Sequence, residues 1–72
     1  MLKVIKEVDI LEEIKCKKSG TYKIALEDKE KLRNKLQELR RNNIFQKYNM
    51  SYVYTETKDN ILLILHDDSI FI

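Results

Sequence analysis

Residues 29–41 read KEKLRNKLQELRR, and this stretch decides how the rest of the chain is interpreted. Each of its residues is a good or fair helix former, and Leu32, Leu36 and Leu39 recur at helical spacing. Asp28 precedes them and can accept hydrogen bonds from the first free backbone amides of a helix. The pattern predicts an amphipathic helix that rests one narrow edge on a second layer and exposes its other sides to water.

The end of this helix is marked by Asn42 and Asn43, either of which can adopt the left-handed conformation that closes a helix. Ile44, Phe45 and Tyr48 then fall off the leucine stripe. We expect a bend or a separate short turn here, with these three side chains packed differently from the leucines.

Two strands are predicted after the helix. Residues 50–57 alternate and are rich in aromatic and β-branched side chains, residues 58–60 (KDN) suit a turn, and residues 61–65 (ILLIL) form an unbroken apolar run. An apolar run of this length is typical of a strand covered on both faces. We therefore predict that it is the central strand of the sheet.

The first part of the chain has two interpretations. Between residues 2 and 17 the even positions are mostly apolar and the odd positions mostly charged, which favours a strand. A helix is the alternative, because Val4, Val8, Leu11 and Ile14 then fall on one stripe. For residues 2–14 the strand is the preferred prediction.

A hairpin would follow from that choice. Lys18, Ser19 and Gly20 supply a polar turn in which Gly20 can take a positive φ, and residues 21–26 supply the second strand, with Tyr22 and Ile24 on one face. The complete interpretation is one α+β domain over residues 1–72, a small antiparallel sheet with one amphipathic helix across a face in a ββαββ-like order. With a helix in the first stretch, the order becomes α-β-α-β-β.

Catalytic and metal-binding motifs are not found. Cys16 is the only cysteine, which excludes an intrachain disulfide, and it is expected to pack as a small hydrophobe on the face of Ile14. The run His66, Asp67, Asp68 lacks the spacing of converging ligands and is interpreted as a solvated strand end. We predict no enzyme activity, no cofactor and no metal.

Targeting and membrane segments are also not recognised. Charged residues interrupt the first residues of the chain, and the longest apolar run has five residues, against about 20 needed to cross a bilayer. The expectation is a cytoplasmic protein with no membrane partner.

Charge is unevenly distributed although the net charge is only +2. Residues 29–47 contain seven basic and two acidic residues, whereas residues 48–72 contain one lysine and four carboxylates, namely Glu56, Asp59, Asp67 and Asp68. One hypothesis is an inhibitor of the counter-defence type carried by mobile elements, in which these four carboxylates occupy the nucleic-acid channel of a nuclease or polymerase.

Apolar residues after the predicted helix and at residues 70–72 favour a protein partner. The candidates are Phe45, Tyr48, Ile70, Phe71 and Ile72, which exceed what one helix can cover. The main functional hypothesis is thus a small non-enzymatic protein-binding module, a regulator or inhibitor that forms a homo-oligomer such as a homodimer, or docks on a larger protein assembly.

A nucleic-acid-binding regulator is the alternative. It would contact phosphates through basic residues of the helix and the preceding turn, and stack bases on Tyr52, Tyr54 or Phe45. The phosphate-contact candidates are Lys15, Lys17, Lys18, Lys29, Arg33, Arg40 and Arg41.

Overall fold

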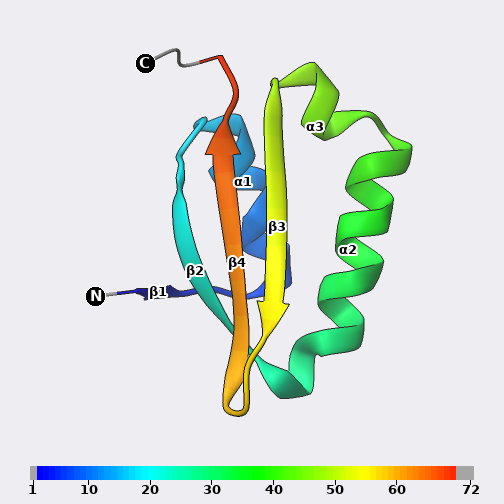
Figure 1. Ribbon diagram of the computed structural model, residues 1–72. Helices are drawn as coiled ribbons and strands as arrows, with labels where there is room; N and C mark the ends of the chain where they lie inside the picture. Colours follow the sequence, from blue (N-terminus) through cyan, green and yellow to red (C-terminus); the bar gives the residue numbers. More distant parts are fainter. Residues whose placement is uncertain (1, 70–72) are drawn as a thin grey trace.

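The chain forms a four-stranded mixed sheet with its helices on one side (Figure 1). The computed structural model describes residues 2–69. In chain order the elements are β1 (Lys3–Val4), the 3-10 turn η1 (Glu7–Asp9), α1 (Ile10–Lys15), β2 (Gly20–Ala25), the 3-10 turn η2 (Leu26–Asp28), α2 (Lys29–Arg41), α3 (Ile44–Lys47), β3 (Met50–Glu56) and β4 (Asn60–Asp67). The α+β class predicted from the sequence is confirmed.

The leucine stripe becomes the buried face of α2, whose bounds agree with the prediction. Leu32, Leu36 and Leu39 are at most 3% exposed, and burying each leucine contributes about 1.5–3 kcal/mol of hydrophobic free energy. The helix ends at Arg41 with Asn42 as its C-cap, and the next residue, Asn43, has a φ of 58° and leads into α3. The expected left-handed cap and the separate short turn are thus both present.

None of the helices within residues 2–69 has the length and apolar character that spanning a membrane requires.

The start of α2 differs from the expectation. Asp28 makes no side-chain capping hydrogen bond. Because η2 runs straight into α2, the carboxylate of Asp28 turns instead toward lysines, with Lys6 Nζ at 3.3 Å and Lys31 Nζ at 4.0 Å. Asp28 therefore ties the helix start to the segment after β1.

The long first strand preferred for residues 2–14 is wrong. In this stretch only β1 is a strand, and η1 and α1 follow it. Ile10 and Ile14, one helical turn apart, are fully buried, whereas Val8 is 63% exposed. The helical alternative is therefore correct only for α1, and it predicts the wrong buried face because its stripe includes the exposed Val8. Ile14 fits both the period-two and the helical pattern, so it could not distinguish a strand from a helix.

The turn before β2 is also different from the predicted hairpin. Lys17 has a φ of 54°, while Gly20 has no positive φ and already belongs to β2. Lys17 follows Cys16, the C-cap of α1, and a left-handed residue at this place is the common way for a helix to end. Because a helix precedes β2, the residue with a positive φ is Lys17 at the end of that helix and not Gly20.

The sheet order is β1-β2-β4-β3, with β1 parallel to β2 and both β4 pairs antiparallel. The central place of β4 agrees with the prediction, but its burial on both faces does not. Ile61, Leu63 and Leu65 are at most 1% exposed, whereas Ile64 is 42% exposed. Only alternate residues of β4 meet the helices, so the sheet is covered on one face.

Candidate functional site

The uncovered face of the sheet is the first candidate surface. Strand register places its residues side by side on the side away from α1, which is turned toward the viewer in Figure 1. We call this surface the open face and define it by Val4, Thr21, Lys23, Ala25, Ser51, Val53, Thr55, Leu62, Ile64 and His66. Lys23 is the only Lys, Arg, Asp or Glu in this set.

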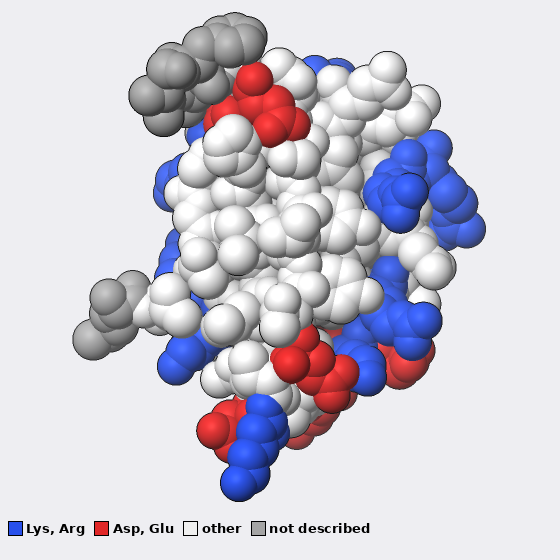
Figure 2. Space-filling model, in the orientation of Figure 1, with Lys and Arg blue, Asp and Glu red and all other residues white. Residues whose placement is uncertain are grey.

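The centre of the open face is apolar. Ile64 on β4 lies directly between Thr21 on β2 and Val53 on β3. Val53 is 61% exposed, and Val4 on the far strand is 70% exposed. Figure 2 shows this face with an uncharged centre and charged side chains gathered at its margins. A contiguous exposed apolar patch is typical of a contact surface, and strand pairing places Val53 next to Ile64 at the centre of this face.

A groove between α2 and β3 is the second candidate surface. It is lined by Arg33, Leu36, Gln37, Arg40, Tyr52 and Tyr54. A neighbouring hollow shares Gln37 and Arg40 and adds Arg41. We call the combined surface the Arg–Tyr groove. Helical spacing places its α2 residues on one side of the helix, and period-two spacing places both tyrosines on the same face of β3.

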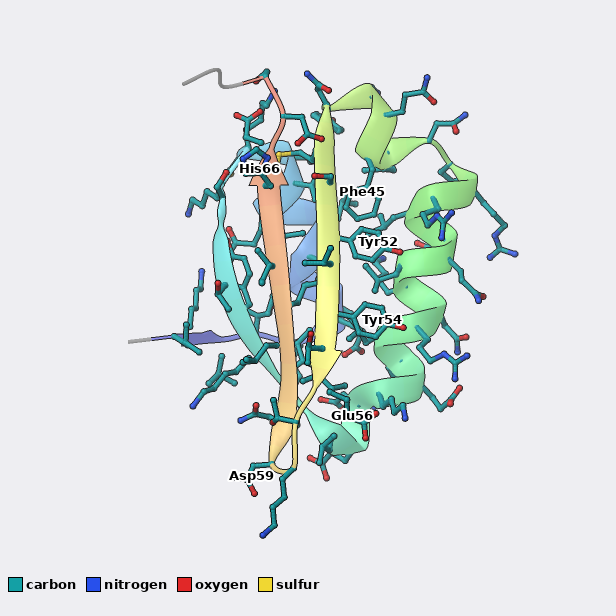
Figure 3. All side chains as sticks on the ribbon, viewed as in Figure 1. Phe45, Tyr52, Tyr54, Glu56, Asp59 and His66 are labelled. Carbon is teal, nitrogen blue, oxygen red and sulfur yellow. The ribbon has the colours of Figure 1, made fainter. Side chains whose placement is uncertain are left out.

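The tyrosines of this groove belong to a row of aromatic rings. The Phe45 and Tyr52 ring centroids are 4.7 Å apart, and the Tyr52 and Tyr54 rings are 6.4 Å apart with an angle of 15° between their planes. Figure 3 shows Tyr52 and Tyr54 pointing from β3 toward α2. Tyr54 is 43% exposed, so the outer end of the row is accessible to a ligand.

The predicted protein-interface residues do not form a surface within the described part of the chain. Phe45 is 8% exposed, because its ring packs against Tyr52 and the buried core. Tyr48 is half-buried, and Lys47 Nζ lies 5.6 Å from the centroid of its ring in a cation–π contact. Their departure from the leucine stripe reflects packing in the core rather than exposure. Ile70, Phe71 and Ile72 lie outside the described residues.

The four predicted mimicry carboxylates are separated. Glu56 and Asp59 lie at the turn between β3 and β4 (Figure 3), whereas Asp67 and Asp68 lie at the opposite end of β4. The two ends are about 20 Å apart at ~3.3 Å per strand residue. Glu56 pairs with Lys29 at 2.7 Å, and Asp67 is only 6% exposed. This arrangement provides no continuous acidic surface.

Asp67 has a structural environment. Its carboxylate accepts hydrogen bonds from the hydroxyl and the backbone amide of Ser69, and Lys17 Nζ lies 3.1 Å away. The Ser69 hydroxyl, and then the Lys17 charge, hold the pKa of Asp67 below its usual value. Hydrogen bonds from His66 and Ser51 lower the pKa of Asp68 in the same way. These carboxylates fasten the end of β4.

The predicted phosphate-contact residues fall on two separate parts of the fold. Lys15, Lys17 and Lys18 lie at the end of α1, whereas the others lie on α2. Several are already paired, as Lys17 is with Asp67, Lys18 with Glu13 at 3.8 Å and Lys29 with Glu56. Arg33 is 3.6 Å from Glu30. Within residues 2–69 no carboxylate pairs with Arg40 or Arg41.

Cys16 does not pack as expected. It is exposed at the end of α1, because the helix directs Ile10 and Ile14 inward and leaves Cys16 on the other side. No group of three His, Cys, Asp or Glu side chains suited to a metal ion occurs in the part of the chain that the structure describes.

The open face was missed by the sequence analysis. Val53 alternates with Tyr52 and Tyr54, so its place opposite the aromatic face was visible in the pattern. The continuous apolar run of β4 concealed that Ile64 shares this outer face. Gln37 was also missed, since it carries no charge and lies off the leucine stripe.

Comparison with known proteins adds no relationship to this geometry. No family model, no curated protein and no solved structure matches the chain.

Proposed function

We propose that this chain is a non-enzymatic protein-binding module whose contact surface is the open face, and that its partner there is a second copy of the chain. The observation that carries the proposal is the exposed Val53–Ile64 pair at the centre of an uncovered sheet. The same surface would be covered when the module docks on a larger protein assembly as a regulator.

The apolar centre supports a protein contact. Removing exposed apolar surface from water gains about 25 cal/mol per Å², and a chain of 72 residues has few other ways to increase its buried area. Two sheets that stack face to face interdigitate their side chains at a spacing of about 10 Å. Thr21 and Ser51 on the open face are small enough to permit such an approach.

The low charge of the open face supports a second copy in particular. A surface that binds an acidic or basic partner carries the complementary charge. On the open face Lys23 is the only Lys, Arg, Asp or Glu residue. A two-fold axis through the Val53–Ile64 pair would place each apolar centre on its equivalent, which is the arrangement of an isologous dimer.

Light scattering on a size-exclusion column tests the proposal. The wild-type chain is expected to have twice its 8.7 kDa mass, and Val53→Lys is expected to be monomeric because it places two charges against each other across the axis. Val8→Lys is the matched control, since Val8 is exposed to a similar extent, 63% against 61%, but lies in η1 on the helix side.

Two results would contradict this assignment. A wild-type chain that remains monomeric as its concentration is raised removes the second copy as the partner. A dimer that persists in Val53→Lys, or that is lost equally in Val8→Lys, places the contact elsewhere on the molecule.

A further inference from the structure

The Arg–Tyr groove points to a second ligand, and we infer that it binds a short segment of single-stranded nucleic acid. This site is distinct from the open face, because Tyr52 and Tyr54 alternate with Val53 and so lie on the opposite side of β3. The inference therefore stands independently of self-association.

The charge of the groove fits an anionic strand. Arg33, Arg40 and Arg41 contribute three guanidinium groups along one length of α2, and Gln37 lies between them. The two arginines toward the end of α2 have no carboxylate partner within residues 2–69, and Arg33 is held loosely at 3.6 Å from Glu30. Guanidinium groups that are free of internal partners can bind phosphate oxygens in the bidentate manner.

The aromatic side of the groove fits bases. Tyr52 and Tyr54 follow one another along β3 with nearly parallel rings; Tyr52 is partly buried against the core, whereas Tyr54 is 43% exposed. A strand whose bases stack on successive aromatic rings while its backbone follows a basic surface is the usual mode of single-strand recognition. A duplex keeps its bases paired and stacked, so it could use the arginines but not the tyrosines.

The other side chains of the groove favour a nucleic-acid strand over an acidic peptide. Carboxylates of a peptide would use the arginines but leave the exposed ring of Tyr54 without a stacking partner. Gln37 can both donate and accept a hydrogen bond, as the edge of a base requires. Glu56 lies beyond Tyr54 on β3 and is neutralised by Lys29 at 2.7 Å, so it does not repel a strand strongly at this end.

Fluorescence anisotropy with a labelled oligothymidine and a labelled oligouridine, titrated from low to physiological salt, tests the inference. With three phosphate contacts, the logarithm of the binding constant should fall with the logarithm of salt concentration with a slope of about −2. Arg40→Gln should weaken binding and reduce the slope by about 0.7. Lys58→Gln removes the same charge at the β3–β4 turn and should change neither.

The tyrosine contact has its own variants. Tyr54→Ala should weaken binding about tenfold or more, and Tyr54→Phe, which keeps the ring, should restore most of it. Val53→Lys should bind the oligonucleotide at least as tightly as the wild type, which separates this site from the open face.

Three outcomes would overturn the inference. The first is that no oligonucleotide binds at low salt. The second is that Arg40→Gln and Lys58→Gln weaken binding equally. The third is that a duplex binds as tightly as the single strand, or that polyglutamate displaces the labelled strand as effectively as an unlabelled single strand does. The last outcome would assign the groove to anions in general.

Discussion

Lys3 Nζ lies 2.7 Å from Glu13 Oε1, and this ion pair joins β1 to α1. The Glu13 side chain is only 7% exposed, and Lys18 Nζ approaches its other oxygen at 3.8 Å. The hydrogen bond to Glu13, followed by the charge of that carboxylate, raises the pKa of Lys3 above its usual value. A buried carboxylate between two lysines thus holds the first strand against the helix that follows it.

Replacing Glu13 should show how much this contact stabilises the fold. Glu13→Gln keeps the shape but leaves both lysines without their partner, so we expect a lower urea midpoint of unfolding. Because the pKa of Lys3 is raised in the folded state, its contribution is present below the unfolded pKa of about 10.4 and is lost as pH rises through the folded value. The loss of stability in alkali should therefore be shallower in the variant.

Glu12→Gln is the matched control for this prediction, since Glu12 is the exposed neighbour in the same helix. Equal midpoints for the two variants would show that the ion pair contributes nothing measurable.

The left-handed residue between α2 and α3 gives a second prediction. Asn43 has a φ of 58°, which costs an ordinary L-residue roughly 1–2 kcal/mol and costs asparagine less. Asn43→Ala should therefore destabilise the fold by about 1 kcal/mol, a fall in melting temperature of roughly 4–8 °C. Asn42→Ala, at a φ of −89°, should have a much smaller effect. Similar losses at both positions would contradict a specific backbone cause.

The carboxylate at the end of β4 predicts sensitivity to acid. The pKa of Asp67 is lowered in the folded state, first by the Ser69 hydroxyl and then by Lys17. Its stabilisation is thus present above the unfolded pKa of about 3.9 and is lost as pH falls through the folded value. We expect Asp67→Asn to be less stable at pH 7 and to lose less stability on acidification, as measured by urea midpoints across this range.

Asp59→Asn serves as the control for the acid prediction, because the Asp59 side chain accepts no hydrogen bond from residues 2–69. An acid profile for Asp67→Asn that coincides with the wild-type profile would show that Asp67 does not govern the acid response.

Particular residues show why the candidate surfaces could be foreseen only in part. The arginines of the Arg–Tyr groove and its tyrosines were each selected from the sequence, for charge and for stacking, but nothing in the sequence placed them in one groove. Phe45 was selected for an interface and instead lies in the core. A side chain off the leucine stripe can be either exposed or buried by another element, and the local pattern is the same in both cases.

Local sequence patterns were enough to predict α2, its left-handed end and the strands β2, β3 and β4, because these depend on propensity and spacing within a few positions of each other. Three features follow from the packing of distant elements instead: Ile10 and Ile14 face inward from a helix, Ile64 is exposed on a strand of continuous apolar residues, and the mimicry carboxylates lie near opposite ends of β4. These features depend on which face of an element its distant neighbours cover, and burial against distant neighbours outweighs the small local preferences between strand and helix.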